Sequence, residues 1–171
     1  MKPTVLQLGP LLPLVEKGLA STYDVLNLAG APAAPDFLAG NGPRIDAIAS
    51  SAKPTILVNC AGFVHGGTVL ECADEEWDMG FRLNVRSTYR TIRAFVPGMI
   101  DQGGGSIINI SSIEGIVGEP NATAYNYSKG GVRIFTKSAA LHCASQGYGI
   151  RVNSVHPGYI LTQMVEKGIG S

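Results

Sequence analysis

Short, almost continuous apolar segments recur along the chain and alternate with longer stretches of helical periodicity. The apolar segments predict strands at residues 4–8, 23–28, 45–49, 55–62, 106–112 and 150–155. None of them alternates strictly between apolar and polar side chains, which is typical of strands covered by helices on both faces. The pattern therefore predicts an α/β fold, with a doubly wound parallel sheet in three layers.

Two long helices are predicted between the later strands. The first begins near Asp74, where a run of acidic residues suits the positive end of a helix, and its periodicity continues to Pro97. The second covers residues 124–145, where apolar side chains recur at helical spacing until a Gln-Gly pair ends the pattern. Residues 30–43 are rich in proline and glycine and predict a loop.

The charge balance narrows the class of partner. Thirteen basic residues stand against thirteen acidic ones, so we expect no broad attraction to nucleic acid or to a membrane surface. A small molecule is the expected partner. The 171 residues, 45% of them hydrophobic, can bury a core and predict one α/β domain over residues 1–171.

Cysteine and histidine usage argues against metal and disulfide sites. Neither residue type shows the spacing of a metal-ligand motif, and the number of cysteines is odd. We expect a reducing, cytoplasmic setting. The first 18 residues resemble neither a signal peptide nor a spanning helix. The residues concerned are Cys60, Cys72, Cys143, His65, His142 and His156.

A candidate for proton transfer lies in AYNYSKGG, residues 124–131. Tyr125 and Lys129 are four residues apart, so a helix places both on one face. At roughly 4 Å and an effective dielectric of about 20, their attraction is about 4 kcal/mol, which predicts a lowered pKa for Tyr125. Tyr127 is two residues from Lys129 and points elsewhere. The alternative is a tyrosine that only covers a lysine stem on a helix surface.

Five segments stand in order around this pair: TILVNCAG, a helix with LNV, SIINISS, YNYSK and RVNSVHPGYILT. Together they resemble the short-chain dehydrogenase/reductases from about Thr55 to Thr162. Ser112 precedes Tyr125 by thirteen positions, the separation that this family uses between its serine and its tyrosine, which favours Ser112 over Ser111. The amino-acid sequence of residues 112–160 looks most similar to that of members that act on cyclic or steroid-like secondary alcohols.

The resemblance implies a Rossmann-like fold, truncated relative to the family, and hydride transfer between NAD or NADP and a secondary alcohol or ketone. Tyr125 would take or give the proton, and Ser112 would hold the substrate oxygen. Lys129 would lower the Tyr125 pKa and bind the nicotinamide ribose. Asn84 would fix a water on a proton path from Lys129. The alternative for Asn84 is an internal helix asparagine satisfied by neighbouring backbone.

The cofactor residues implied by the resemblance lie mainly beyond predicted strands. Ala61 and Gly62 are small enough to let a dinucleotide approach the backbone. Cys60 stands where the family usually has a second asparagine. The implied set is Asn59, Ala61, Gly62, Tyr125, Lys129, Pro157, Gly158, Ile160 and Thr162.

The opening of the chain departs from this family. The expected T-G-x-x-x-G-x-G phosphate loop is absent, and GPLLPLVEKGL follows the first predicted strand. Residues 1–50 instead resemble the strand-helix-strand opening of D-2-hydroxyacid dehydrogenases, and the family's covering helices and last strand do not follow Ser171. We interpret the chain as a chimera or recombinant fragment that carries an oxidoreductase catalytic half. Cofactor binding should be weak, and a catalytically silent α/β scaffold is the alternative.

The resemblance also implies a homo-oligomer. Members of the family pair their two long helices across a two-fold axis into a four-helix bundle. Here these helices are predicted near residues 74–97 and 124–145. We expect Phe95, Val132 and Phe135 to be among the side chains that a monomer would expose.

Overall fold

The computed structural model describes residues 4–7, 24–27 and 54–160. The elements within these ranges follow one another along the chain. They are strands β1 (Thr4–Gln7), β2 (Asp24–Asn27) and β3 (Ile56–Asn59), helix α4 (Asp74–Gly80), the π-helix η1 (Phe81–Arg86), helix α5 (Ser87–Asp101), strand β4 (Gly105–Ile110), the 3₁₀ turn η2 (Ile113–Gly115), helix α6 (Thr123–Ser145) and strand β5 (Ile150–Val155).

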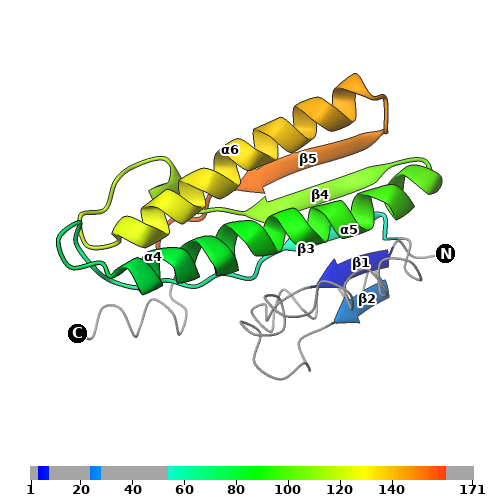
Figure 1. Cartoon of the computed structure of the whole chain (residues 1–171). Coiled ribbons are helices and arrows are strands. Elements are labelled where there is room, and N and C mark those ends of the chain that lie inside the picture. Colours follow the sequence, from blue (N-terminus) through cyan, green and yellow to red (C-terminus); the bar gives the residue numbers. More distant parts are fainter. Residues whose placement is uncertain (1–3, 8–23, 28–53, 161–171) are drawn as a thin grey trace.

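The five strands form one parallel sheet in the order β2-β1-β3-β4-β5 (Figure 1). Five of the six predicted strands are confirmed, and the sixth, at residues 45–49, lies outside the described residues. The predicted bounds were too long at the carboxyl ends, since β3 stops at Asn59 and β4 at Ile110. Residues 60–62 and 111–112 therefore lie beyond the strands, at the sheet edge where open α/β folds bind ligands.

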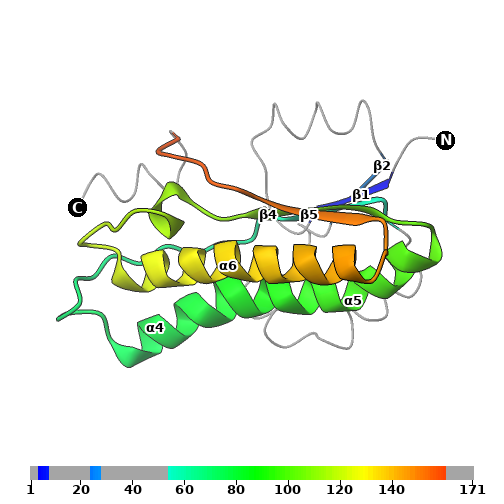
Figure 2. The same cartoon turned by 90° about the horizontal axis from the view of Figure 1, so that it is seen from above.

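Helices α5 and α6 lie side by side on one face of the sheet (Figure 2). The side chains of Leu57, Ile107 and Val152 point into this interface and are buried with Phe95 and Met99 from α5. On the opposite face Ile108 is half-buried and residues 151 and 153 of β5 are exposed. The fold is thus a Rossmann-like parallel α/β sheet, in which the described residues supply the sheet and one of the expected helical layers.

A polar network runs through the interface between the sheet and these helices. The Asn59 Nδ2 donates to Asn109 Oδ1 at 2.8 Å, and the Thr91 hydroxyl donates to Asn59 Oδ1 at 2.6 Å. The Asn109 Nδ2 in turn donates to Thr136 Oγ1 at 2.9 Å. All four side chains are buried, so each hydrogen bond satisfies a group that water cannot reach. The network joins β3, β4, α5 and α6.

The prediction that the first helix ends at Pro97 was wrong, because α5 continues to Asp101 with Pro97 inside it. Proline removes the hydrogen bond to the carbonyl four residues earlier, here that of Arg93. Both Arg93 and Pro97 are exposed, so water can reach that carbonyl. Met99, two residues further, is fully buried in the core and favours continuation of the helix.

Helix α6 confirms the second prediction almost to the residue. Gly147 follows its end at φ +66°, the left-handed conformation that glycine adopts readily after a helix. Val132 and Cys143 face the interior as expected.

Two of the three side chains that we expected a monomer to expose are buried. Phe95 and Val132 are each only 1% exposed, because both pack within the chain's own core. They would not be exposed in a monomer. The large apolar side chains that α4, α5 and α6 do expose are Trp77, Tyr89, Tyr127, Ile134 and Leu141.

Candidate active site

Most of the predicted site residues that the structure describes follow β3, β4 and β5 at the carboxyl edge of the sheet, and the others lie in η1 and α6. Asn59 ends β3 and residues 60–62 follow it, Ser112 lies beyond β4, and Pro157, Gly158 and Ile160 lie beyond β5. The first turns of α6 supply Tyr125 and Lys129, and η1 supplies Asn84. Thr162 lies outside the described residues.

Lys129 is buried beneath this edge, with only 3% of its surface exposed. Its Nζ donates to the Ile110 carbonyl at 2.9 Å and lies 5.5 Å from the centroid of the Tyr125 ring. Burial lowers the Lys129 pKa to about 8, and the negative charge of a Cys60 thiolate works in the opposite direction. A Cβ on Gly62 would lie 3.1 Å from Nζ, so the small residue after β3 leaves room for the ammonium.

The pKa of Tyr125 is raised above its usual value, whereas the sequence analysis predicted a lowered pKa. Burial of the ring is the main cause, and the Glu114 carboxylate adds to it, whereas a hydrogen bond with the Ser112 side chain works to lower the pKa. The expected lowering by Lys129 was wrong for this arrangement. The ammonium lies against the tyrosine ring and donates its hydrogen bond to Ile110.

Ser112 stands directly before η2 in an extended conformation. Its Oγ accepts a hydrogen bond from the Glu114 amide at 3.1 Å and caps the 3₁₀ turn. A serine hydroxyl that donates to the phenol oxygen would lower the Tyr125 pKa, and Ser112 has this effect. The neighbouring Ser111 hydroxyl donates to the Lys129 carbonyl at 2.8 Å. This geometry favours Ser112 over Ser111 as the residue that faces a substrate.

Tyr127 belongs to the packing between helices. Its ring stacks on Trp77 of α4, with centroids 4.2 Å apart and planes inclined by 10°. The choice of Tyr125 over Tyr127 as the acid/base stays a prediction.

Asn84 connects three parts of the site. Its Oδ1 accepts from the Phe63 amide at 2.8 Å, and its Nδ2 donates to the Phe63 carbonyl at 2.9 Å and to Ser128 Oγ at 2.7 Å. Backbone does satisfy this side chain, but from a loop 21 residues away rather than from its own helix. Asn84 lies in a π-helical turn, a deviation often found at functional sites. The contacts to Phe63 and Ser128 carry no sequence pattern that could have revealed them.

Asn59 and Gly62 face different surroundings. The side-chain amide of Asn59 is buried and bonded to Asn109 and Thr91, which favours the backbone of this residue for any contact with a cofactor. Gly62 is exposed, and Ala61 is half-buried beside it. Beyond β5, the Pro157 carbonyl accepts from the Ile113 amide at 2.9 Å, which ties the Pro-Gly segment to the segment after Ser112.

Glu114 was missed by the sequence analysis. Burial and the nearby Glu119 raise the pKa of its carboxyl, and a hydrogen bond from Tyr159 works to lower it. Its Oε2 is buried without a hydrogen-bond partner within the described ranges. The one feature of the sequence that could have indicated Glu114 is its acidic side chain two positions after Ser112.

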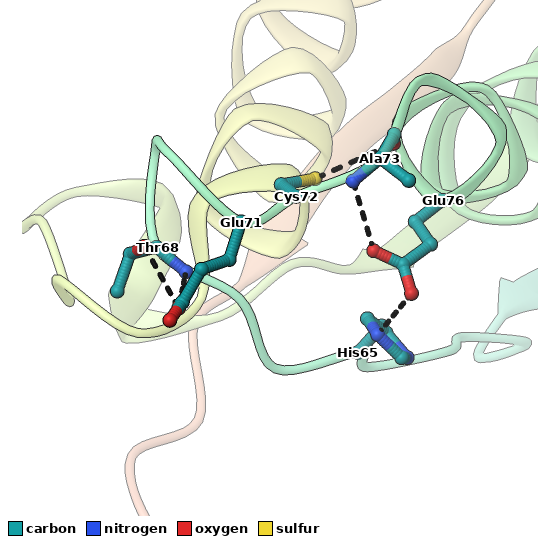
Figure 3. Close-up of polar contacts among 6 residues, drawn as sticks. All are labelled: His65, Thr68, Glu71, Cys72, Ala73 and Glu76. Atoms are coloured by element: carbon teal, nitrogen blue, oxygen red, sulfur yellow. Dashed lines mark hydrogen bonds and ion pairs between the residues drawn. The ribbon is translucent and has the colours of Figure 1, made fainter.

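The loop between β3 and α4 is closed by polar contacts of its own (Figure 3). His65 pairs with one carboxylate oxygen of Glu76, while the other accepts from the Ala73 amide at 3.1 Å and so caps α4. Thr68 donates to Glu71 at 2.8 Å. Within residues 54–160 and the two short N-terminal strands, no group of three His, Cys, Asp or Glu side chains could hold a metal ion. The helices described there include none long and apolar enough to cross a membrane.

Comparisons with known proteins agree with this arrangement. The sequence model of the short chain dehydrogenases matches residues 45–169. The NADP-dependent (R)-specific alcohol dehydrogenase of Lentilactobacillus kefiri is 48% identical over 113 residues, which cover 66% of this chain and 45% of that protein. The cyclopentanol dehydrogenase of a Comamonas strain is 46% identical over 120 residues, 70% of this chain and 47% of that protein. The chain thus spans about half the length of these relatives.

Solved structures give the same result. A short-chain dehydrogenase from Streptomyces avermitilis superimposes with a TM-score of 0.79 at 26% identity, over 96% of this chain and 68% of that one. An oxidoreductase of the family from Burkholderia thailandensis gives a TM-score of 0.82 at 24% identity, over 99% of this chain and 73% of that one, and supports the fold. The resemblance of residues 1–50 to D-2-hydroxyacid dehydrogenases is tested by none of these matches and stays a prediction. With its family match, its parallel sheet and the Ser112–Tyr125–Lys129 grouping at the sheet edge, the chain belongs to the short-chain dehydrogenase family.

Proposed function

We propose that this chain transfers a hydride between NAD or NADP and a secondary alcohol or ketone, with Tyr125 as the acid/base. The observation that carries the proposal is the buried Lys129 ammonium 5.5 Å from the centroid of the Tyr125 ring, together with the Ser112 side chain, which lowers the Tyr125 pKa. The family match and the two alcohol dehydrogenases among its relatives support the same reaction class.

Each residue has a task that its contacts permit. In reduction, the Tyr125 hydroxyl gives its proton to the carbonyl oxygen of the substrate, and in oxidation it takes the proton back. Ser112 Oγ accepts from the Glu114 amide, and its one proton can turn from the Tyr125 phenol oxygen to the oxygen of a bound substrate and hold it near Tyr125. Lys129 places its ammonium against the Tyr125 ring, 5.5 Å from the ring centroid, and this cation–π contact helps to hold the ring in place.

The residues at the sheet edge fit the nicotinamide end of a cofactor. Gly62 is exposed, and its missing side chain leaves the Lys129 ammonium close to the surface of the loop. When bound, the nicotinamide supplies or receives the hydride. Tyr125, Lys129, Gly158, Ile160 and the backbone of residues 59–62 would hold that end of the molecule.

The sequence offers fewer binding groups for the phosphate end of the cofactor. The chain lacks the T-G-x-x-x-G-x-G sequence that places backbone donors around a pyrophosphate. Each missing charge-assisted hydrogen bond removes about 1.5–3 kcal/mol. We therefore propose weak cofactor binding. The same absence favours the second candidate, an α/β scaffold that keeps the site residues but does not turn over.

Titration of intrinsic fluorescence with NADH and NADPH separates these two candidates. Saturable quenching with a dissociation constant above the low micromolar range is the expected result. No binding of either nucleotide by a folded chain would support the silent scaffold.

Tyr125→Phe, compared with Tyr127→Phe, tests the acid/base assignment in an assay of cyclopentanone reduction. Loss of proton transfer typically costs about 10²–10⁴-fold in rate. We expect that loss for Tyr125→Phe and little change for Tyr127→Phe, because the Tyr127 ring is stacked on Trp77. Equal losses from the two substitutions would contradict the assignment.

A further inference from the structure

His156 occupies a position that the proposed mechanism does not use. It follows β5 directly and is half-buried. Its Nδ1 lies 3.0 Å from the Ser112 carbonyl oxygen, and its Nε2 lies 2.9 Å from Ser154 Oγ. The imidazole therefore bridges strand β5 and the residue proposed to hold the substrate oxygen.

The partners of the two ring nitrogens determine the tautomer. A carbonyl oxygen can only accept, so Nδ1 must carry the proton that is donated to Ser112. In the neutral ring Nε2 then has a lone pair and accepts from the Ser154 hydroxyl. The result is an ordered chain in which Ser154 donates to His156 and His156 donates to Ser112.

The same peptide unit is held at its other end. The carbonyl of Ser112 and the amide of Ile113 belong to one plane, and that amide donates to the Pro157 carbonyl at 2.9 Å. Consecutive residues 156 and 157 thus hold both polar groups of the Ser112–Ile113 peptide. Since β4 ends at Ile110, no regular ladder fixes this peptide. Its carbonyl accepts from the Gly115 amide at 3.0 Å within the 3₁₀ turn, and the imidazole is a second donor to the same oxygen.

The orientation of this peptide also sets the direction of the Ser112 side chain. Ser112 has φ −160° and ψ 160°, and its Oγ accepts from the Glu114 amide one peptide further on. A rotation of the Ser112–Ile113 peptide would move both ends of that contact. It would also move the Ser112 hydroxyl relative to Tyr125, whose pKa this hydroxyl lowers.

We propose that His156 is a positioning residue of this site: its Nδ1–H, fixed by Ser154, clamps the Ser112–Ile113 peptide and so aims the Ser112 hydroxyl. The effect on catalysis rests on the proposed oxidoreductase function, but the clamp itself does not. His156 acts through Ser112 and needs no contact with substrate or cofactor.

Nuclear magnetic resonance of the ¹⁵N-labelled chain tests the clamp without any turnover. Long-range ¹H–¹⁵N correlations should show the His156 proton on Nδ1, and the Nε2–H tautomer would overturn the proposal. Amide exchange of Ile113 provides a second readout, because an amide freed from its partner exchanges faster. It should be faster in His156→Leu than in the wild-type chain, and unchanged exchange would also overturn the proposal.

His156→Asn is the matched variant for the kinetic test. The asparagine Nδ2 can stand in for Nδ1 and donate to Ser112, although it loses the contact with Ser154. We expect His156→Leu to lower kcat for cyclopentanone reduction by about 100-fold, since misplacement by about 1 Å can cost that much. The KM for the cofactor should stay nearly constant, and His156→Asn should recover most of the loss.

The outcomes separate the two proposals. If the wild-type chain transfers no hydride, the proposed function fails, while the tautomer and the Ile113 exchange still decide whether the clamp exists. If the wild-type chain is active, equal kcat values for wild type and His156→Leu would overturn the positioning role. Equally slow Asn and Leu variants would overturn it too, because the donor to Ser112 would then not be the property that matters.

Discussion

Lys129→Met would remove a buried ammonium and leave an unbranched side chain of similar length. In the folded chain the Lys129 pKa is about 8, and in the unfolded chain it returns to about 10.5. Between these values the unfolded state binds more protons than the folded state, so stability rises with pH. The burial of this ammonium thus destabilises the folded chain most at and below neutral pH, and the penalty falls as pH rises through 8 to 10.5.

The two pKa values give the size of the effect. One pKa unit corresponds to about 1.4 kcal/mol, and the full shift of roughly 2.5 units corresponds to about 3 kcal/mol. Between pH 7 and pH 9.5 the linkage relation predicts a gain of about 2 kcal/mol in the free energy of unfolding. Stopping at pH 9.5 avoids most of the opposing effect of Tyr125, whose raised pKa makes stability fall as pH rises above about 10.

Urea unfolding of wild type and Lys129→Met at pH 7, 8, 9 and 9.5 measures this gain. The quantity to compare is the difference between the two proteins at each pH, because other titrating groups, including the buried Cys143 thiol, largely cancel in it. We expect the stability of wild type relative to the variant to rise by about 2 kcal/mol over this range. A pH-independent difference would refute the reasoning, since it would mean that the ammonium has an ordinary pKa despite its burial.

Three other substitutions test separate parts of the structure. Glu114→Gln removes a charge that raises the Tyr125 pKa, so the tyrosinate absorbance that Tyr125→Phe abolishes should appear at lower pH; an unchanged titration would contradict this. Thr136→Val removes the acceptor for the buried Asn109 amide at nearly constant volume and should cost about 1–3 kcal/mol in urea unfolding; a neutral effect would show that the amide finds another partner. Leu141 is 72% exposed on α6, and Leu141→Glu should shift light scattering of a self-associated chain toward the monomer; a monomeric wild type would refute self-association.

The sequence predicted some elements closely, for identifiable reasons. Strand β5 was predicted residue for residue, because glycines precede it and Pro157 follows it closely. Strand β4 was predicted to end two residues too late and to begin one residue too late. Its final serines look like a continuation of the apolar run, and only the contacts of Ser111 with α6 and of Ser112 with η2 show that the ladder has ended.

The grouping of the site was predictable, but its electrostatics were not. Helical spacing alone placed Tyr125 and Lys129 on one face of α6. The direction of the Tyr125 pKa depends on how deeply the ring is buried and on Glu114, which comes from another element. The contacts of Asn84 and His156 likewise join residues 21 to 44 positions apart, and no local pattern encodes them.

The polar network beneath the sheet also has a consequence for strand alignment. Asn59 and Asn109 are register partners in β3 and β4, and a slip of one residue would turn one of them to the opposite face. Amide groups in the core would then lose their partners, so misaligned pairings of these strands are penalised chemically as well as sterically. All four residues of the network lie between positions 59 and 136, in the part of the chain that also holds Ser112, Tyr125 and Lys129. The hydrogen bonds that penalise misaligned pairing of β3 and β4 thus lie within residues 59–136, whichever segment precedes them.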